Sequence, residues 1–198
     1  MSLELVNTLA TFGTFLVIAA TAIAAIVQLR HARSSNQIAA LNELRETIVT
    51  PDFQDAQHFV LTELTTRLKD PAFRHQYAEP TARTDEARPL NTKINAIGNF
   101  YEGMGLLVKT GLIDKSLVLE MWYDTLIQTW RRLVPITAIG RRRLGDSIWE
   151  NFEYLTVLAE DYMAAHPKGA YPTGVRRIEL DDEWLDADKQ YAASLAPA

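Results

Sequence analysis

The chain has 198 residues, of which 47% are hydrophobic and 23% charged, so its composition is that of a folded protein and excludes a wholly disordered chain. The formal net charge of -5 argues against broad neutralisation of phosphates, and we expect no nucleic-acid partner. The chain has no cysteine, which excludes disulfides, thiolate metal sites and cysteine nucleophiles.

The first predicted element is a transmembrane helix, because the stretch from Leu5 to Leu29 has no charged residue. A helix of this length spans roughly 37 Å, more than the ~30 Å of a hydrocarbon core. The side chains that we expect to anchor it are large and apolar: Leu9, Phe12, Phe15, Leu16, Ile18, Ile23, Ile26 and Leu29.

The charges that flank this stretch predict its orientation. Glu4 precedes it without any Lys or Arg, whereas Arg30 and Arg33 follow it. The positive-inside tendency then places the short N-terminus outside the membrane and the rest of the chain in the cytoplasm, as a single-pass protein. A cleaved signal peptide and a buried helix of a soluble protein remain alternative interpretations of the same stretch.

One face of the predicted membrane helix carries small or polar residues at alternating steps of four and three. They are Ala10, Thr14, Val17, Thr21, Ala24 and Gln28. Such a face allows two helices to approach closely, which predicts a homo-oligomer formed through this helix. The alternative is that these residues only dilute its hydrophobicity.

Helical periodicity continues after the predicted membrane segment. The apolar repeat of Ile38, Leu41, Leu44 and Ile48 predicts an amphipathic extension that ends at Thr50. A second helix is predicted over residues 51–69, with Phe53, Ala56, Val60, Leu64 and Leu68 facing inward. A short turn of helix over residues 72–77 and a polar loop follow.

Three further helices are predicted before the tail. The first covers residues 90–110 and carries an apolar stripe with Gly98 and Gly105 on the same face; the stripe comprises Ile94, Ile97, Tyr101, Met104 and Val108. The second covers residues 115–134, buries Leu117, Met121, Leu126 and Trp130, and ends or kinks at Pro135. The third covers residues 136–166.

These patterns predict an all-α fold in which a single N-terminal transmembrane helix continues into a small cytoplasmic helical bundle. No stretch has the alternation typical of a strand. We divide the chain into an anchor and juxtamembrane segment over residues 1–33, a bundle over residues 34–167, and an acidic, partly disordered tail over residues 168–198 with one weak helix.

A polar strip on the helix of residues 90–110 is the candidate site. It consists of Asn91, Asn95, Asn99 and Glu102, and we expect a cation such as Arg131 or Arg132, or one of residues 141–143, to partner the half-buried carboxylate. Three interpretations stay open: a hydrogen-bond network that fixes the register of the helices, a polar pocket for a small ligand, and simple exposure to solvent.

The clustered arginines allow two interpretations. Residues 131, 132 and 141–143 supply five cations that suit anionic lipid headgroups, or that form ordinary ion pairs with acidic side chains such as Glu150 and Glu153. Asp55 and His58 have metal-ligand spacing, but no second such element exists. We expect no metal, no cofactor and no catalytic residue, because known catalytic motifs are absent from the sequence.

Two segments carry a resemblance to a known family. They are INAIGNFYEGMGLLVKTGLID, at residues 94–114, and SIWENFEYLTVLA, at residues 147–159. Together they resemble DUF 4760, a bacterial membrane-anchored family of unknown function. The features in common are Asn99 with Glu102, the turn of residues 111–114, and Arg131 or Arg132. The resemblance implies the same architecture over roughly residues 5–165 and implies no activity.

The sequence therefore predicts a membrane-tethered interaction protein, acting as a scaffold, sensor or regulator toward a protein partner, with the lipid bilayer as a further partner. An alternative is a membrane-acting effector in stress or phage defence that works through oligomerisation. A third is an enzyme whose site is assembled from scattered residues.

Overall fold

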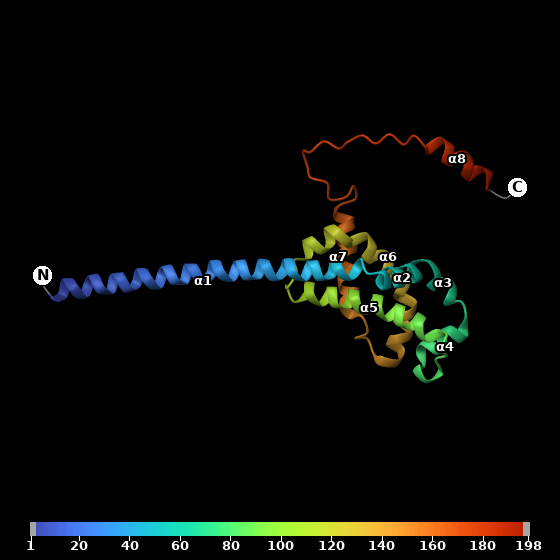
Figure 1. Cartoon of the computed structure of the whole chain (residues 1–198), viewed down its shortest axis with the longest axis horizontal. Helices are drawn as coiled ribbons and strands as arrows, with labels where there is room; N and C mark the ends of the chain where they lie inside the picture. The colour runs from blue at the N-terminus through green and yellow to red at the C-terminus, as the bar shows by residue number, and fades with distance from the viewer. Residues whose placement is uncertain (1–2, 196–198) are drawn as a thin grey trace. The chain divides into compact units, whose positions relative to one another are not determined.

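This computed structural model describes residues 3–195, without the side chains of residues 5, 6, 9 and 10 (Figure 1). Every regular element in the described residues is a helix, and the first is long and apolar, which confirms the predicted all-α fold with an apolar N-terminal helix. The chain forms two compact units, one ending at Pro167 and the other beginning at Lys168.

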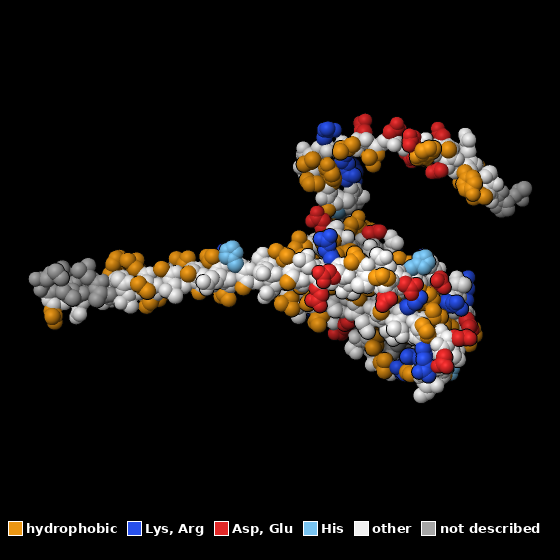
Figure 2. Space-filling view, viewed as in Figure 1, with side chains coloured by type: hydrophobic (Ala, Val, Ile, Leu, Met, Phe, Trp, Pro, Cys, Tyr) orange, Lys and Arg blue, Asp and Glu red, His pale blue; other side chains and the backbone are white. Residues whose placement is uncertain are grey.

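Helix α1 runs unbroken from Leu3 to Ile48. Within Thr11–Ile48, an 18-residue stretch has a mean hydropathy of 2.2 and no buried residue, so α1 is long and apolar enough to cross a membrane by length and composition. A signal sequence near the N-terminus would meet the same criterion. Figure 2 shows hydrophobic side chains all along the described part of this stretch.

The predicted anchor residues expose most of their side chains. Phe12, Phe15, Leu16, Ile18, Ile23, Ile26 and Leu29 are 51–70% exposed. The side chain of Leu9 lies outside the part that the structure describes. These apolar side chains therefore have no neighbours in the fold that shield them from solvent.

The end of α1 joins the bundle. Leu44 is buried there, while Leu41 and Ile48 pack partly against the core. Ile38 is exposed, so the packed face begins about one turn later than the apolar repeat predicts. Nearer the apolar stretch, the guanidinium of Arg33 donates a hydrogen bond to the carbonyl oxygen of Gly111 at 3.2 Å.

The second predicted helix is present but is not uniform. It consists of α2 (Pro51–His58), a π-helical segment, η1 (Phe59–Glu63), and α3 (Leu64–Arg67). Thr50 caps its start by accepting a hydrogen bond from the backbone N–H of Phe53. The predicted inward residues are buried except for Leu68, which is partly buried.

Helix α4 (Pro71–Ala78) is capped by Asp70, whose carboxylate accepts from the backbone N–H of Ala72 at 2.8 Å. A 3-10 turn, η2 (Pro80–Ala82), follows. Helix α5 (Ala87–Lys109) is the central element, and its predicted apolar stripe is buried in full. Gly111 ends this region in the left-handed conformation, with φ of 70°.

Of the two predicted alternatives at Pro135, an end or a kink of the helix, the end is wrong, and so is a new helix that starts at residue 136. Helix α6 (Lys115–Leu144) continues through Pro135 and ends at Gly145, which has φ of 93°. Helix α7 (Glu150–Ala165) begins only after the intervening turn. The reason is burial, because Ile136 and Ile139, which follow the proline, lie in the core and hold the segment in the helix.

The predicted inward face of α6 also differs from the observed one. Leu117 and Met121 are exposed, whereas Val118 and Leu119 are buried. Helix α6 contacts α7 on one side and the π segment and α4 on another, so adjacent residues are buried together. The prediction assumed one apolar stripe that packs against one neighbouring helix, and it therefore missed residues buried against the other neighbours.

In the second compact unit, α8 (Leu185–Ser194) is the only regular helix among the described residues, and all of its residues are exposed. The guanidinium of Arg177 lies over the ring of Tyr171, 4.7 Å from its centroid.

Candidate functional site

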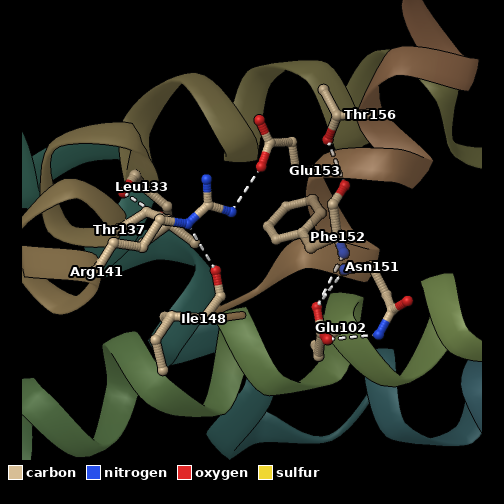
Figure 3. A network of polar contacts seen from close by, with 9 residues as sticks. All are labelled: Glu102, Leu133, Thr137, Arg141, Ile148, Asn151, Phe152, Glu153 and Thr156. Carbon is tan, nitrogen blue, oxygen red and sulfur yellow. Dashed lines mark hydrogen bonds and ion pairs between the residues drawn. The ribbon is translucent and has the colours of Figure 1, made fainter. Parts of the chain in front are cut away.

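Glu102 of α5 caps the start of α7 across the helix interface (Figure 3). One carboxylate oxygen accepts hydrogen bonds from the backbone N–H groups of Asn151, at 3.0 Å, and Phe152, at 2.9 Å. The other oxygen accepts from the Nδ2 of Asn151 at 2.6 Å. The donors to this carboxylate are thus on α7, not on the arginines that the sequence suggested.

The start of α7 needs such a partner. The first N–H groups of any helix lack partners within it, and the N-cap residue Trp149 makes no side-chain cap. Trp149 has a left-handed backbone, with φ of 53°, which costs a non-glycine residue about 1–2 kcal/mol. The Glu102 carboxylate satisfies two of these N–H groups and places a negative charge at the positive end of the helix dipole.

Two glycines on α5 allow α7 to come this close. A Cβ on Gly98 would overlap the indole ring of Trp149, and a Cβ on Gly105 would overlap the carbonyl oxygen of Asn151. The sequence predicted a close approach at these two glycines. The structure assigns the approaching segment to the start of α7.

Arg141 of α6 holds the other side of the same junction. Its Nε donates to the carbonyl oxygen of Ile148 at 3.0 Å, and its Nη2 pairs with Glu153 at 2.6 Å (Figure 3). On α5, the Nζ of Lys109 donates to the Oδ1 of Asn151 at 3.0 Å. Three helices are therefore tied together around the first turn of α7.

Beside this junction lies a cleft of about 210 Å³ with both polar and apolar walls. We call it the arginine cleft; its polar lining consists of Tyr77, Arg83, Asn95, Asn99, Arg143 and Trp149. The residues come from α4, the loop after it, α5, the end of α6 and the turn before α7. Two residues of the predicted polar strip, Asn95 and Asn99, thus face one cleft with two arginines.

Hydrogen bonds order the walls of the arginine cleft. The Tyr77 hydroxyl donates to the Oδ1 of Asn95 at 3.3 Å, and the Nε1 of Trp149 donates to the Oδ1 of Asn99 at 3.0 Å. Burial raises the pKa of Tyr77 to about 12, although the positive charges of Arg83 and Arg143 act in the opposite direction.

The remaining residues of the predicted site lie elsewhere. Arg131 and Arg132 line a separate groove of about 460 Å³ beside Pro135, where Arg132 donates to the Oγ1 of Thr65 at 3.2 Å. Asn91 is buried, and neither of its side-chain polar atoms has a hydrogen-bond partner among the described residues. The structure therefore does not bring the six predicted residues into one pocket.

Sequence reasoning did not single out Tyr77, Arg83 or Asn151. Asn151 lies at the second position of α7 and not at its N-cap, so the N-cap preferences of a sequence could not have singled it out. Tyr77 and Arg83 lie in a region that the sequence described only as a short helix and a polar loop. Within the described residues, no group of three or more His, Asp or Glu could hold a metal ion.

Residues 15–157 match the family model of DUF4760, a domain of unknown function. The chain belongs to this family. The family region includes most of α1, the Glu102 junction and the arginine cleft, and it excludes the second compact unit. Neither curated proteins nor solved structures gave a match.

Proposed function

We propose that this member of the DUF4760 family is a membrane-tethered interaction protein, anchored by α1, whose helical bundle binds a partner in the bacterial cytoplasm. One observation carries the proposal. A single unbroken helix exposes large apolar side chains over its first part and packs into the bundle at its end.

The exposed part of α1 is unfavourable in water. Fully burying a large apolar side chain is worth roughly 1.5–3 kcal/mol, and soluble monomers rarely expose a contiguous apolar surface of this extent. The bundle has its own core, to which the residues between Phe12 and Leu29 do not contribute. These facts support a bilayer as the environment of this segment.

The connection between anchor and bundle supports a tether of fixed geometry. Ala40, Leu41, Leu44 and Ile48 of α1 pack on the core, and Arg33 bonds to Gly111 in the turn after α5. Arg30 and Arg33 follow the apolar stretch, which favours a cytoplasmic bundle. A bundle held near the membrane would act by raising the effective concentration of its partner there.

A pair of charge substitutions tests the anchor. Each arginine at the centre of a membrane helix costs about 2.5–3.5 kcal/mol, so Ile18→Arg with Ile23→Arg should abolish insertion. The matched control is Ile38→Arg, an exposed isoleucine of the same helix beyond the apolar stretch. We expect the wild type and the control to remain in the pellet after carbonate extraction, and the double variant to leave it.

The same preparation separates the alternatives. Mass spectrometry of the purified chain would show a shortened N-terminus if α1 were a cleaved signal peptide. Because the chain has no cysteine, a single Ser35→Cys reports orientation through labelling with an impermeant thiol reagent, and a cytoplasmic bundle predicts protection in intact cells.

Recovery of the wild type in the soluble fraction would overturn the proposal. Growth arrest on expression would favour a membrane-acting effector instead.

A further inference from the structure

The arginine cleft has a net positive lining in a chain of negative net charge. Among the described residues that line it there are two arginines and no acidic side chain. The whole chain carries a formal charge of -5. A local positive site of this kind attracts an anion, because no neighbouring carboxylate competes for the guanidinium groups.

The two arginines differ in how they are held. Arg83 is fixed by its Nε, which donates to the carbonyl oxygen of Gln76 at 3.2 Å, and by its Nη2, which donates to that of Tyr77 at 3.4 Å. Arg143 makes no hydrogen bond or ion pair within the described part of the chain. One guanidinium is therefore pre-positioned, and the other is free to close on a ligand.

The neutral groups of the cleft are oriented as donors. The Oδ1 atoms of Asn95 and Asn99 already accept from Tyr77 and from Trp149, whose indole N–H can only donate. The amide NH₂ groups of both asparagines donate to no other described residue and stay available. Arginines and amide donors on different elements surround one small space.

We propose that the arginine cleft binds a small tetrahedral oxyanion of the phosphate class through Arg83 and Arg143, with the amides of Asn95 and Asn99 as neutral donors. Guanidinium forks match phosphate oxygens in pairs. The volume of about 210 Å³ is below the ~300–1,000 Å³ of sites for larger ligands, so the occupant is a phosphate group with few other atoms inside. The proposal goes beyond the tethering function and does not depend on it.

Inorganic phosphate is the first probe, added to the full chain in neutral detergent at constant ionic strength with chloride as the reference anion. Binding to the folded state alone raises the unfolding midpoint as phosphate increases. We expect this rise in the wild type, and calorimetry should give a dissociation constant that Arg143→Gln weakens about tenfold or more.

The matched control is Arg142→Gln, which removes the same charge from the adjacent exposed position, outside the cleft lining. It should keep the wild-type affinity, and Arg143→Lys should recover part of it. Arg143 bonds to no described residue, so its substitution should leave the midpoint without phosphate unchanged. Equal weakening by Arg142→Gln and Arg143→Gln would overturn the cleft as the site.

Nanodiscs separate a lipid headgroup from a free phosphate as the source. The full chain is placed in phosphatidylcholine discs with or without phosphatidic acid. A midpoint increase that requires phosphatidic acid and Arg143 indicates a lipid phosphate, whereas an increase with inorganic phosphate in phosphatidylcholine alone indicates a free one. The proposal fails if neither source changes the midpoint, or if the change is the same in Arg143→Gln.

Discussion

The Glu102 carboxylate stabilises the start of a helix to which it does not belong. Its partners Asn151 and Phe152 are 49 and 50 residues away in sequence. These hydrogen bonds form only when α5 and α7 are packed in the native register. The contact therefore couples the formation of α7 to the tertiary structure.

Glu102→Ala should lower the free energy of unfolding by about 2 kcal/mol, because it leaves two backbone N–H groups at the start of α7 without an acceptor. Urea unfolding of the full chain in detergent measures this loss. The control is Glu150→Ala, which removes an exposed acidic side chain from the first turn of the same helix and should cost under about 1 kcal/mol. Equal losses would show that Glu102 acts only as a charge near the helix end.

For Glu102, the sequence predicted that the carboxylate needs hydrogen-bond donors, but it did not predict which groups donate. A half-buried glutamate on an apolar helix required a donor, and that expectation followed from the cost of burying a charge. The donors are largely backbone N–H groups. Every residue except proline has one, so the residue types in the sequence do not show which of them donate. The polar strip likewise divides in the fold, since Asn91 is buried in the core while Asn95 and Asn99 line the arginine cleft.

Among the helices, local signals located the starts of α2 and α6 but not that of α7, which begins at Glu150 and not at residue 136. Thr50 with Pro51, and Asp114, cap helices through neighbouring residues, so the sequence alone indicates them. The end of α6 depends on a balance instead. A proline inside a helix costs about 3 kcal/mol, whereas burying Ile136 and Ile139 gains roughly 1.5–3 kcal/mol each. The gain from burial exceeds the cost, so α6 continues past Pro135.

The spacing between α5 and α7 predicts opposite effects for two nearby glycines. Gly105→Ala should destabilise the chain by several kcal/mol, because its Cβ would overlap the backbone of Asn151 and force the helices apart. Gly103→Ala has no atom within 4 Å of its Cβ and should stabilise α5 by up to about 1 kcal/mol.

Thermal or urea unfolding of both variants in the same detergent checks this difference. If both alanines stabilise the chain, α5 and α7 do not pack as closely as the structure shows.

At the scale of the whole molecule, aromatic rings connect α5, α6 and α7 in the core. Tyr101 of α5 stacks on Phe152 of α7 with ring centroids 4.8 Å apart, and Trp130 of α6 meets the same ring edge-on at 5.0 Å. Burial raises the pKa of Tyr101 to about 12. The hydroxyl of Tyr77 is raised to about 12 as well.

These two tyrosines predict a loss of stability at high pH. Their pKa in the unfolded chain is about 10, so the unfolded state loses protons first and is favoured as pH rises. Stability from this source is fully present below about pH 10 and disappears toward pH 12, with roughly 2–3 kcal/mol at stake for each residue.

Urea unfolding at intervals from pH 9 to 12 measures this loss, with Tyr191→Phe, an exposed tyrosine of α8, as the control. Tyr101→Phe should weaken the dependence on pH and Tyr191→Phe should not. An unchanged slope in Tyr101→Phe would contradict the assignment.

The unbroken course of α1 sets a rotational phase between the apolar stretch and the bundle. An α-helix turns by about 100° per residue, so one residue inserted between Arg33 and Ala40 would rotate the bundle by that angle and displace it by about 1.5 Å. Seven inserted residues would restore the original angle to within about 20°. The number of residues along α1 therefore sets the direction in which the bundle faces its neighbours.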